Sequence, residues 1–180
     1  MNNETGENSN YFSQNLSFLK ASYPSLYRDL HAVSGMPRFE KAKKGGLTIK
    51  LEGVYIESRF DPENESRKLF GKLQTRPAGF FVFLGTGLGY HINFLLEDEG
   101  AGGMLIEQSR EIFRASLFII RPDVLRRIVP FVGVDVKPGE IGALLTEDAL
   151  VVSHRRSIQG RERYYSRAGS LIKNCIREIE

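Results

Sequence analysis

The sequence has little cysteine, no long apolar run and almost no net charge, and each shortage excludes a class of protein. A single cysteine, Cys175, excludes an internal disulfide and a metal site built from cysteines. The longest apolar runs, such as 80–84, have the length of a strand and fall short of a membrane span. The formal charge of +3, from 25 basic and 22 acidic residues, is too balanced to favour nucleic acid as a partner.

The N-terminal segment and the spacing of the histidines argue against a signal peptide and a metal site. Residues 1–10 are polar and lack the basic region and apolar core of a signal peptide, which predicts a cytoplasmic location. Their Asn, Ser and Glu content predicts a disordered tail. The three histidines, His31, His91 and His154, have no metal-ligand spacing, so no metal is expected.

Residues 11–60 predict a small N-terminal appendage of helices and a β-hairpin. Apolar positions from Tyr11 to His31 fit two short helices broken at Pro24. Residues 47–51 and 54–56 alternate apolar and polar side chains, which indicates a hairpin. Asp61 and Pro62 then begin a helix that runs to about residue 73.

Three alternate glycines follow the apolar strand predicted over 80–84. Gly85, Gly87 and Gly89 lie between this strand and a helix predicted over 88–96. A strand, a glycine turn and a helix together let a backbone approach a ligand at a helix N-terminus. Glycine suits the position because a side chain would block that approach. The turn therefore predicts a nucleotide or nucleotide-sugar site, with a tight turn that binds no ligand as the alternative.

An acidic residue, Glu107, ends the next predicted strand, 22 residues after Gly85 (107 − 85). An acid at this place commonly accepts hydrogen bonds from ribose hydroxyls. The candidate ligand-binding residues are therefore Gly85, Thr86, Gly87, Gly89, Tyr90, His91 and Glu107.

The ligand itself stays open, because the glycine spacing departs from the dinucleotide fingerprint. The chain has G-x-G-x-G, which is closer to the first motif of S-adenosylmethionine-dependent methyltransferases, although Phe83 stands where those enzymes usually carry an acid. His91 donates to a phosphate, caps the local backbone or faces solvent, and a helix N-terminus should lower its pKa.

Strands and helices continue to alternate after Glu107. Ser109 is placed to cap a helix, a helical turn follows Pro122, strands are predicted over 131–136 and 149–153, and a helix over 138–145. This alternation predicts an α/β, Rossmann-like fold with a mostly parallel sheet and flanking helices over residues 61–180. Right-handed crossovers should place the loops after Leu84 and Ile106 side by side.

The last segment, 160–180, carries an apolar stripe at helical spacing. The stripe consists of Tyr164, Ala168, Leu171, Ile172, Cys175, Ile176 and Ile179. It either packs on the chain's own sheet or awaits a partner. Nearby arginines between 155 and 167 form the densest basic cluster, which is read mainly as a solvated helix face.

Four segments together resemble the N-terminal domain of the motility-associated factor (Maf) glycosyltransferase family, of flagellin-modifying type. Residues 85–91, Gly-Thr-Gly-Leu-Gly-Tyr-His, are similar to its Gly-Leu-Gly-Leu-Gly-Tyr-His turn, with Thr86 as a departure. Residues 58–62 resemble its Ser-Arg-Tyr-Asp-Pro segment. The Asn15-Leu16 pair with residues 24–26, and Ile106-Glu107 with Phe113, match further segments.

The resemblance implies a role in bacterial protein glycosylation and flagellar motility. Family members continue into a central domain with a Gly-Pro-Ser-Leu type motif, to which sugar transfer is assigned, and no such string occurs here. The expectation is therefore an accessory or nucleotide-binding-like domain, not obviously catalytic alone. Its expected partner is a catalytic glycosyltransferase domain or polypeptide, or a second copy through the C-terminal helix. The alternatives are a methyltransferase-like protein and a non-catalytic interaction module.

Overall fold

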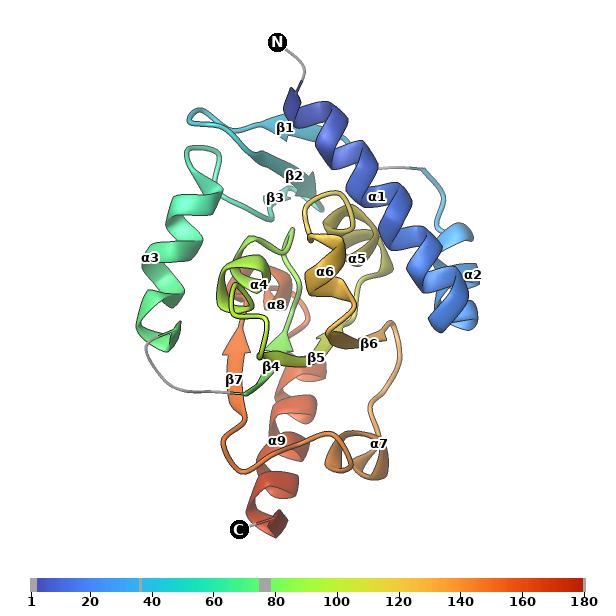
Figure 1. Cartoon of the computed structure of the whole chain (residues 1–180), viewed down its shortest axis with the longest axis vertical. Helices are drawn as coiled ribbons and strands as arrows, with labels where there is room; N and C mark the ends of the chain where they lie inside the picture. The colour runs from blue at the N-terminus through green and yellow to red at the C-terminus, as the bar shows by residue number, and fades with distance from the viewer. Residues whose placement is uncertain (1–2, 36, 75–78, 180) are drawn as a thin grey trace.

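The computed structural model describes residues 3–35, 37–74 and 79–179. Its centre is a four-stranded parallel sheet in the order β6-β5-β4-β7 (Figure 1). These strands are β4 (Phe80–Leu84), β5 (Gly102–Glu107), β6 (Ile128–Val132) and β7 (Leu150–Ser153). The strand order reverses between β4 and β7, which is the place where open α/β sheets usually bind ligands. The predicted Rossmann-like α/β fold is confirmed.

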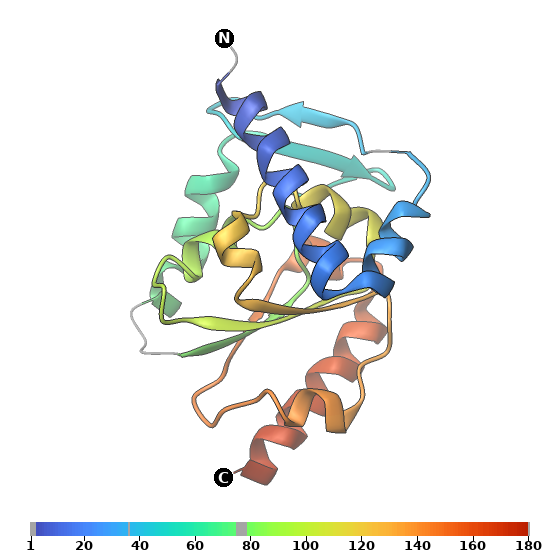
Figure 2. The ribbon, with the colours of Figure 1, turned by 45° about the vertical axis from the view of Figure 1, so that its right-hand side comes forward.

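Helices cover both faces of this sheet (Figure 2). After the N-terminal pair, the helices are α3 (Pro62–Gln74), α4 (Tyr90–Leu95), α5 (Arg110–Ser116), α6 (Pro122–Leu125), α7 (Pro138–Gly142), α8 (Arg155–Ile158) and α9 (Glu162–Ile179). Alternate residues of β4 serve the two faces, because successive strand side chains point in opposite directions. Phe81 and Phe83 join the core beneath α4, α5 and α6, whereas Val82 and Leu84 join the core beneath α7 and α9.

The N-terminal residues form two helices, α1 (Asn3–Ser22) and α2 (Pro24–His31), which separate at Pro24 as predicted. Helix α1 begins at Asn3, so the predicted disorder of residues 1–10 is wrong for 3–10, and residues 1–2 lie outside the described chain. Leu19 and Leu30 are fully buried in the same core as Phe81 and Phe83. The helical part of the appendage therefore shares the core of the Rossmann-like region.

A buried amide ties α1 to this core. The Nδ2 atom of Asn15 donates to the carbonyls of Leu117 and Ile120 at 2.9 and 2.7 Å, and the Asn15 side chain is fully buried. These carbonyls follow α5 and would otherwise be buried without a partner. This long-range contact orients α1 across the sheet.

The predicted hairpin is present as β2 (Leu47–Leu51) and β3 (Val54–Tyr55), which pair antiparallel. A third strand that the sequence did not indicate, β1 (Phe39–Lys41), pairs with β2 on the other side. The resulting three-stranded sheet lies at the end of the molecule that carries α1 (Figure 1).

Some boundaries differ from those expected. The third sheet strand covers 128–132 instead of 131–136, because Ile128 pairs with Gly103 beside the buried β5. Residues 133–136 lie in the connection to α7, and the helices that start at Pro122 and Pro138 end after one turn. Asp61 caps α3 by accepting from the Asn64 amide at 3.1 Å, and Ser109 caps α5 by accepting from the Ile112 amide at 3.2 Å, as predicted.

The apolar stripe of α9 packs on the chain's own sheet. Ile172 is fully buried, Cys175 is nearly so, and both contact the core that contains Val82 and Met104. Ile176 is partly buried against the same core, and Ile179 is 38% exposed. The exposed patch on which self-association was predicted is therefore small, and association itself stays a prediction. Glu180 lies outside the described residues.

Across the described ranges, no helix is both long enough and apolar enough to cross a membrane.

Candidate functional site

The glycine turn connects β4 to α4 at the strand-order reversal of the sheet. Gly85, Gly87 and Gly89 all have positive φ, at 85°, 52° and 92°. A side chain would also clash at each of them. A Cβ on Gly85 would lie 2.6 Å from the Ser157 Cβ, and one on Gly89 would meet the Ile120 side chain. Glycine is thus required for both conformation and space.

The amides of the turn are hydrogen-bonded to the protein's own side chains. The Thr86 amide donates to Glu107 Oε2 at 2.8 Å, and the Gly87 amide donates to Ser157 Oγ at 2.8 Å. The Leu88 amide donates to Glu57 Oε1 at 2.7 Å. A carboxylate, a hydroxyl and a second carboxylate thereby occupy donors of the kind that cradle phosphates in nucleotide-binding turns.

Two of these partners, Glu57 and Ser157, escaped the sequence analysis, as did the role of His154. Ser157 lies in α8, a one-turn helix that His154 caps by accepting from the Ser157 amide at Nδ1. With Nδ1 accepting, Nε2 carries the ring proton and faces Glu57 Oε1 at 3.4 Å. Glu57 follows β3, whereas His154 and Ser157 follow β7, and these residues come together only in the folded chain. The available sequence signal was an acid, Glu57, directly after the predicted hairpin.

Glu107 is fully buried and both of its carboxylate oxygens are engaged. Besides accepting from Thr86, it accepts at Oε1 from the Ser109 amide and the Tyr165 hydroxyl, each at 2.8 Å. Burial raises the pKa of the Glu107 carboxyl, and these three donors oppose that rise. The same burial, together with the charge of Glu107, raises the pKa of Tyr165. The predicted ribose acceptor therefore serves as a junction of β4, β5 and α9.

His91 lies in the apolar core under the turn. Its ring packs near Phe70 and His154, each with centroids 5.1 Å apart, and near Phe83 at 5.8 Å. The pKa of His91 is well below its ordinary value, as predicted, but burial is the main cause and His154 adds to it. The helix dipole proposed from the sequence is not needed to explain the shift.

The glycine turn is buried and does not face solvent. All seven predicted site residues, from Gly85 to Glu107, are buried. The turn brings Thr86 and Glu107 together as expected from neighbouring parallel strands. The assignment of these residues as ligand contacts stays a prediction. Ligand binding at this turn would require Glu57, Glu107 or Ser157 to release an amide.

One of the predicted residues, Tyr90, lines a cavity of about 690 Å³ beside the turn. Its hydroxyl bonds to the backbone of Leu47, donating to the carbonyl at 3.1 Å and accepting from the amide at 2.6 Å. The cavity lies between α1, α3, α4 and the hairpin, and its other lining residues include Tyr11, Phe39, Arg67, Phe94, Phe118 and Arg121. Acidic and basic side chains both line the cavity, so the charge of the lining does not indicate whether a ligand would be an anion or a cation.

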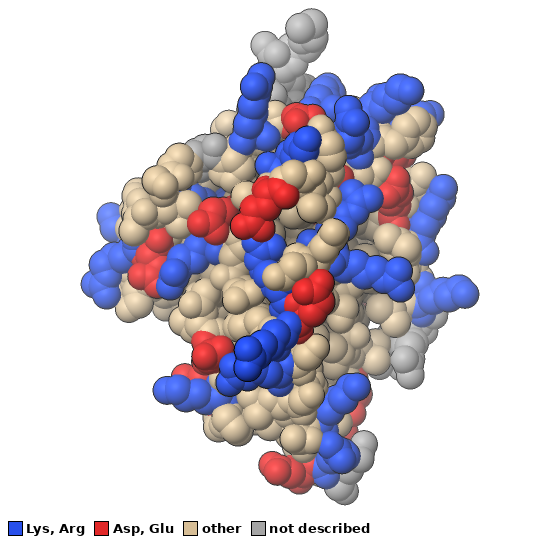
Figure 3. All heavy atoms as spheres, turned by 180° about the vertical axis from the view of Figure 1, so that it is seen from behind, with Lys and Arg blue, Asp and Glu red and all other residues tan. Residues whose placement is uncertain are grey.

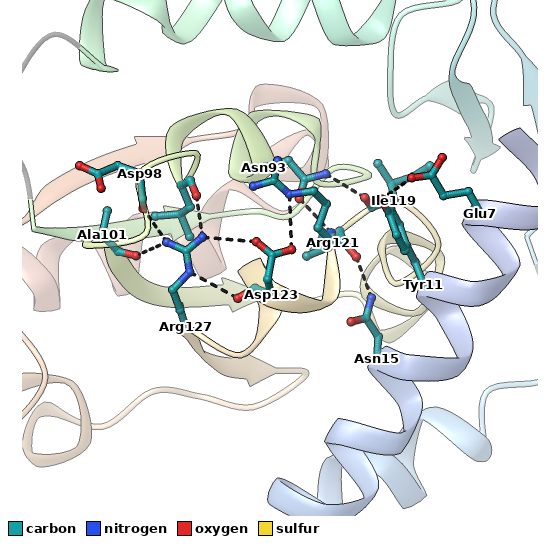
Figure 4. Close-up of polar contacts among 12 residues, drawn as sticks. Glu7, Tyr11, Asn15, Asn93, Asp98, Ala101, Ile119, Arg121, Asp123 and Arg127 are labelled. Carbon is teal, nitrogen blue, oxygen red and sulfur yellow. Dashed lines mark hydrogen bonds and ion pairs between the residues drawn. The ribbon is translucent and has the colours of Figure 1, made fainter.

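Polar contacts along one wall of this cavity hold the helices together (Figure 4). Asn93 donates to the Ile119 carbonyl at 2.8 Å and accepts from the Arg121 amide at 3.0 Å. Tyr11 donates to Glu7 at 2.5 Å, which is the main reason that the pKa of Tyr11 rises to about 12. Further along, the Arg127 guanidinium donates to the carbonyls of Leu96, Asp98 and Ala101. This arginine therefore has a structural role.

The comparisons with known proteins point to one family. Residues 58–122 match the family model described as glycosyltransferase Maf N-terminal domain. Among solved structures, the Maf glycosyltransferase from Magnetospirillum magneticum AMB-1 matches with a TM-score of 0.63 and 16% identity, over 92% of this chain and 35% of that one. This chain thus spans about a third of the length of that protein.

MNMC2 from Aquifex aeolicus matches with a TM-score of 0.35 and 9% identity, over 78% of this chain and 60% of that one, which is too distant to support an argument. No curated protein matches the sequence. The matched region, 58–122, contains the hairpin exit, α3, the glycine turn and β5. Residues 58–122 are therefore similar to a glycosyltransferase Maf N-terminal domain, and the chain shares its fold with part of a Maf glycosyltransferase.

Proposed function

We propose that the chain is a non-catalytic accessory domain of bacterial flagellin glycosylation. It acts in the cytoplasm and positions a catalytic glycosyltransferase domain or polypeptide. The observation that carries this proposal is the use of the turn amides of Thr86, Gly87 and Leu88 by Glu107, Ser157 and Glu57. A turn whose donors serve internal contacts favours a scaffold over a nucleotide site.

The burial of these partners supports the same conclusion. Glu107 and Ser157 are fully buried and Glu57 is 5% exposed, so none offers a reactive group to a substrate. Displacing a buried carboxylate from its amide removes a hydrogen bond from a buried charged oxygen, at a cost of about 1–3 kcal/mol. The turn therefore fixes the hairpin, β5 and α8 relative to one another.

Reconstituted sugar transfer tests the proposal. Purified chain, flagellin and a CMP- or UDP-sugar should give no change in the intact mass of flagellin. Adding the separately produced transferase polypeptide should produce glycosylated flagellin faster with the chain present than without it. Sugar transfer by the chain alone would contradict the accessory role.

A second measurement addresses the methyltransferase alternative. The purified chain should retain no labelled S-adenosylmethionine on gel filtration, because Glu107 is fully buried and both of its carboxylate oxygens already accept hydrogen bonds within the protein. S-adenosylmethionine carries no phosphate, so this test reports on the glycine turn and not on any phosphate site elsewhere. Retention of the label would favour the methyltransferase reading.

A further inference from the structure

A cluster of lysine and arginine residues lies on the hairpin sheet, away from the glycine turn. Two chain segments form its base, because the Lys43 amide donates to the Arg59 carbonyl at 2.9 Å and the Lys44 amide donates to the Phe60 carbonyl at 2.7 Å. This backbone pairing fixes the turn after β1 beside the segment before α3. Two lysines, an arginine and a phenylalanine thereby come to one place from positions about 16 residues apart in the sequence.

Aromatic rings order these cations. The Nζ atoms of Lys43 and Lys44 lie 6.0 and 5.7 Å from the ring centre of Phe60, which is 50% exposed. The Arg59 guanidinium lies 4.8 Å from the ring centre of Tyr55. Stacking of this kind holds an arginine in place while its N–H groups remain available for an anion.

Two more cations border the same tyrosine. Lys50 lies 5.5 Å from the Tyr55 ring centre, and Arg156 donates to the Tyr55 carbonyl at 3.2 Å. We call the exposed residues Lys43, Lys44, Lys50, Arg59 and Arg156, with Tyr55 and Phe60, the cationic surface. It joins two basic clusters that are about 100 residues apart in the sequence, and Figure 3 shows many Lys and Arg side chains at the upper end of the molecule, where the hairpin sheet lies.

The neighbouring acids Glu40 and Glu52 bond to groups other than these five cations. Across the described ranges, none of the five cations forms an ion pair with a carboxylate. The nearby acid Glu52 pairs with Arg161 at 3.1 Å instead. Glu40 accepts from the Tyr55 hydroxyl at 3.1 Å, which ties its carboxylate to the ring on which Arg59 stacks.

A concave site lies within this surface. A cavity of about 430 Å³ is lined by Glu40, Lys41, Lys43, Thr48, Arg59 and Phe60. Such a volume falls within the range of small-molecule sites, about 300–1,000 Å³. The Thr48 hydroxyl is engaged with the backbone of Glu57, so Lys43 and Arg59 supply the donors that face a ligand.

We propose that this cavity binds the phosphate group of an organic phosphate, with the attached apolar or planar part resting on Phe60. A phosphate oxyanion suits the site because the planar guanidinium of Arg59 can donate two parallel hydrogen bonds. Lys43 in the cavity lining and Lys44 beside Phe60 add positive charge. The exposed face of Phe60 provides the apolar contact that a lone inorganic anion would not use. This site is independent of the accessory role, since it shares no residue with the glycine turn.

Titration of the purified chain with inorganic pyrophosphate tests the phosphate contact directly. Calorimetry should show saturable binding that weakens as salt is raised. The double variant K43E/K44E should bind at least about tenfold more weakly, because the Lys43 contact is lost and two positive charges at the site become negative. The matched control K68E/K173E changes net charge equally at exposed lysines elsewhere and should bind like the wild type.

Two substitutions of Arg59 separate the effect of its bidentate hydrogen bonding from the effect of its positive charge. Arg59→Lys keeps the charge and should weaken binding several-fold, whereas Arg59→Met removes the charge and should weaken it further, by about tenfold. Equal affinity of wild type and K43E/K44E, or equal losses in K43E/K44E and the control, would overturn the site. Circular dichroism and melting temperature establish that each variant is folded.

A further experiment distinguishes a phosphate on a lipid headgroup from a phosphate on a soluble ester. Co-sedimentation with phosphatidylglycerol vesicles, but not with phosphatidylcholine vesicles, and competition by pyrophosphate would assign the site to anionic lipid headgroups. Pyrophosphate binding without vesicle binding would assign it to a soluble phosphate ester. Binding to neither overturns the proposal, as does binding to an acidic polypeptide alone, which would indicate a protein partner.

Discussion

The carboxylate of Glu57 accepts the amide proton of Leu88 at 2.7 Å, so the residue that follows the hairpin closes the glycine turn of the Rossmann-like region. Glu57 is 5% exposed, and its Oε1 atom also lies 3.4 Å from His154 Nε2. The turn is therefore held from the N-terminal appendage on one side and from α8 on the other. Stability, more than ligand affinity, should respond to changes here.

Substitution of Gly87 tests this view. Gly87 and Gly53 both have positive φ, at 52° and 83°, but a Cβ on Gly87 would lie 2.6 Å from His154 Nε2, whereas one on Gly53 would meet nothing within 4 Å. We expect Gly53→Ala to lower the free energy of unfolding by about 1 kcal/mol and Gly87→Ala to lower it by about 3 kcal/mol. Urea denaturation measures both, and equal losses would show that the turn is not closely packed.

The hydroxyl of Tyr165 should matter more than that of its neighbour. Tyr165 donates to the buried Glu107 carboxylate at 2.8 Å, whereas Tyr164 donates to the Val134 carbonyl at 2.7 Å near the surface. Tyr165→Phe should reduce the free energy of unfolding by about 2 kcal/mol and Tyr164→Phe by about 1 kcal/mol, because hydrogen bonds to buried charged groups contribute more. The reverse order in thermal or chemical denaturation would argue against a charged Glu107.

Arg127 offers a test of a structural arginine. Its guanidinium donates to the carbonyls of Leu96, Asp98 and Ala101 at 2.6–2.7 Å, an arrangement that the single ammonium of lysine cannot reproduce. Arg127→Lys should cost about 2 kcal/mol and speed amide exchange over 96–101. The exposed neighbour provides the control, since Arg126→Lys should change stability by less than about 0.5 kcal/mol. Similar exchange in both variants would contradict this role.

His91 should make the native state sensitive to acid. Burial holds the folded-state pKa of His91 well below 6.5, so the unfolded chain binds the proton more readily. The stability contributed by neutral His91 is present above pH 6.5 and is lost as the pH falls from there toward the lowered pKa, with a slope of at most about 1.4 kcal/mol per pH unit.

The variant His91→Phe should remove this slope while filling the aromatic core between Phe70 and Phe83. Denaturation at pH 7.5 and pH 5 should therefore show a smaller acid loss in His91→Phe than in the wild type. His31→Phe replaces an exposed histidine and serves as the control. If His91→Phe loses as much unfolding free energy between pH 7.5 and pH 5 as the wild type, another group causes the loss of stability in acid.

The sequence by itself determined the elements and the fold class. Local signals sufficed where they were strong: Pro24 separated two helices, Asp61 and Ser109 capped theirs, and the apolar run at 80–84 became the central strand. These features depend on residues within a few positions of one another, which is the range over which capping, proline geometry and side-chain periodicity act. The predicted bounds of the third strand, 131–136, were wrong because the limits of β6 (128–132) depend on its pairing with β5.

Only the tertiary structure decided which groups the amides of the glycine turn contact. The spacing of Gly85, Gly87 and Gly89 is compatible with either a bound phosphate or a packed turn, since both need positive φ and space without a Cβ. The choice depends on Glu57 and Ser157, which lie 31 and 70 residues from their amide partners. The cationic surface likewise forms because backbone pairing joins Lys43 to Arg59. Local sequence patterns do not encode such long-range contacts, because they form only when the sheet and its appendage pack together.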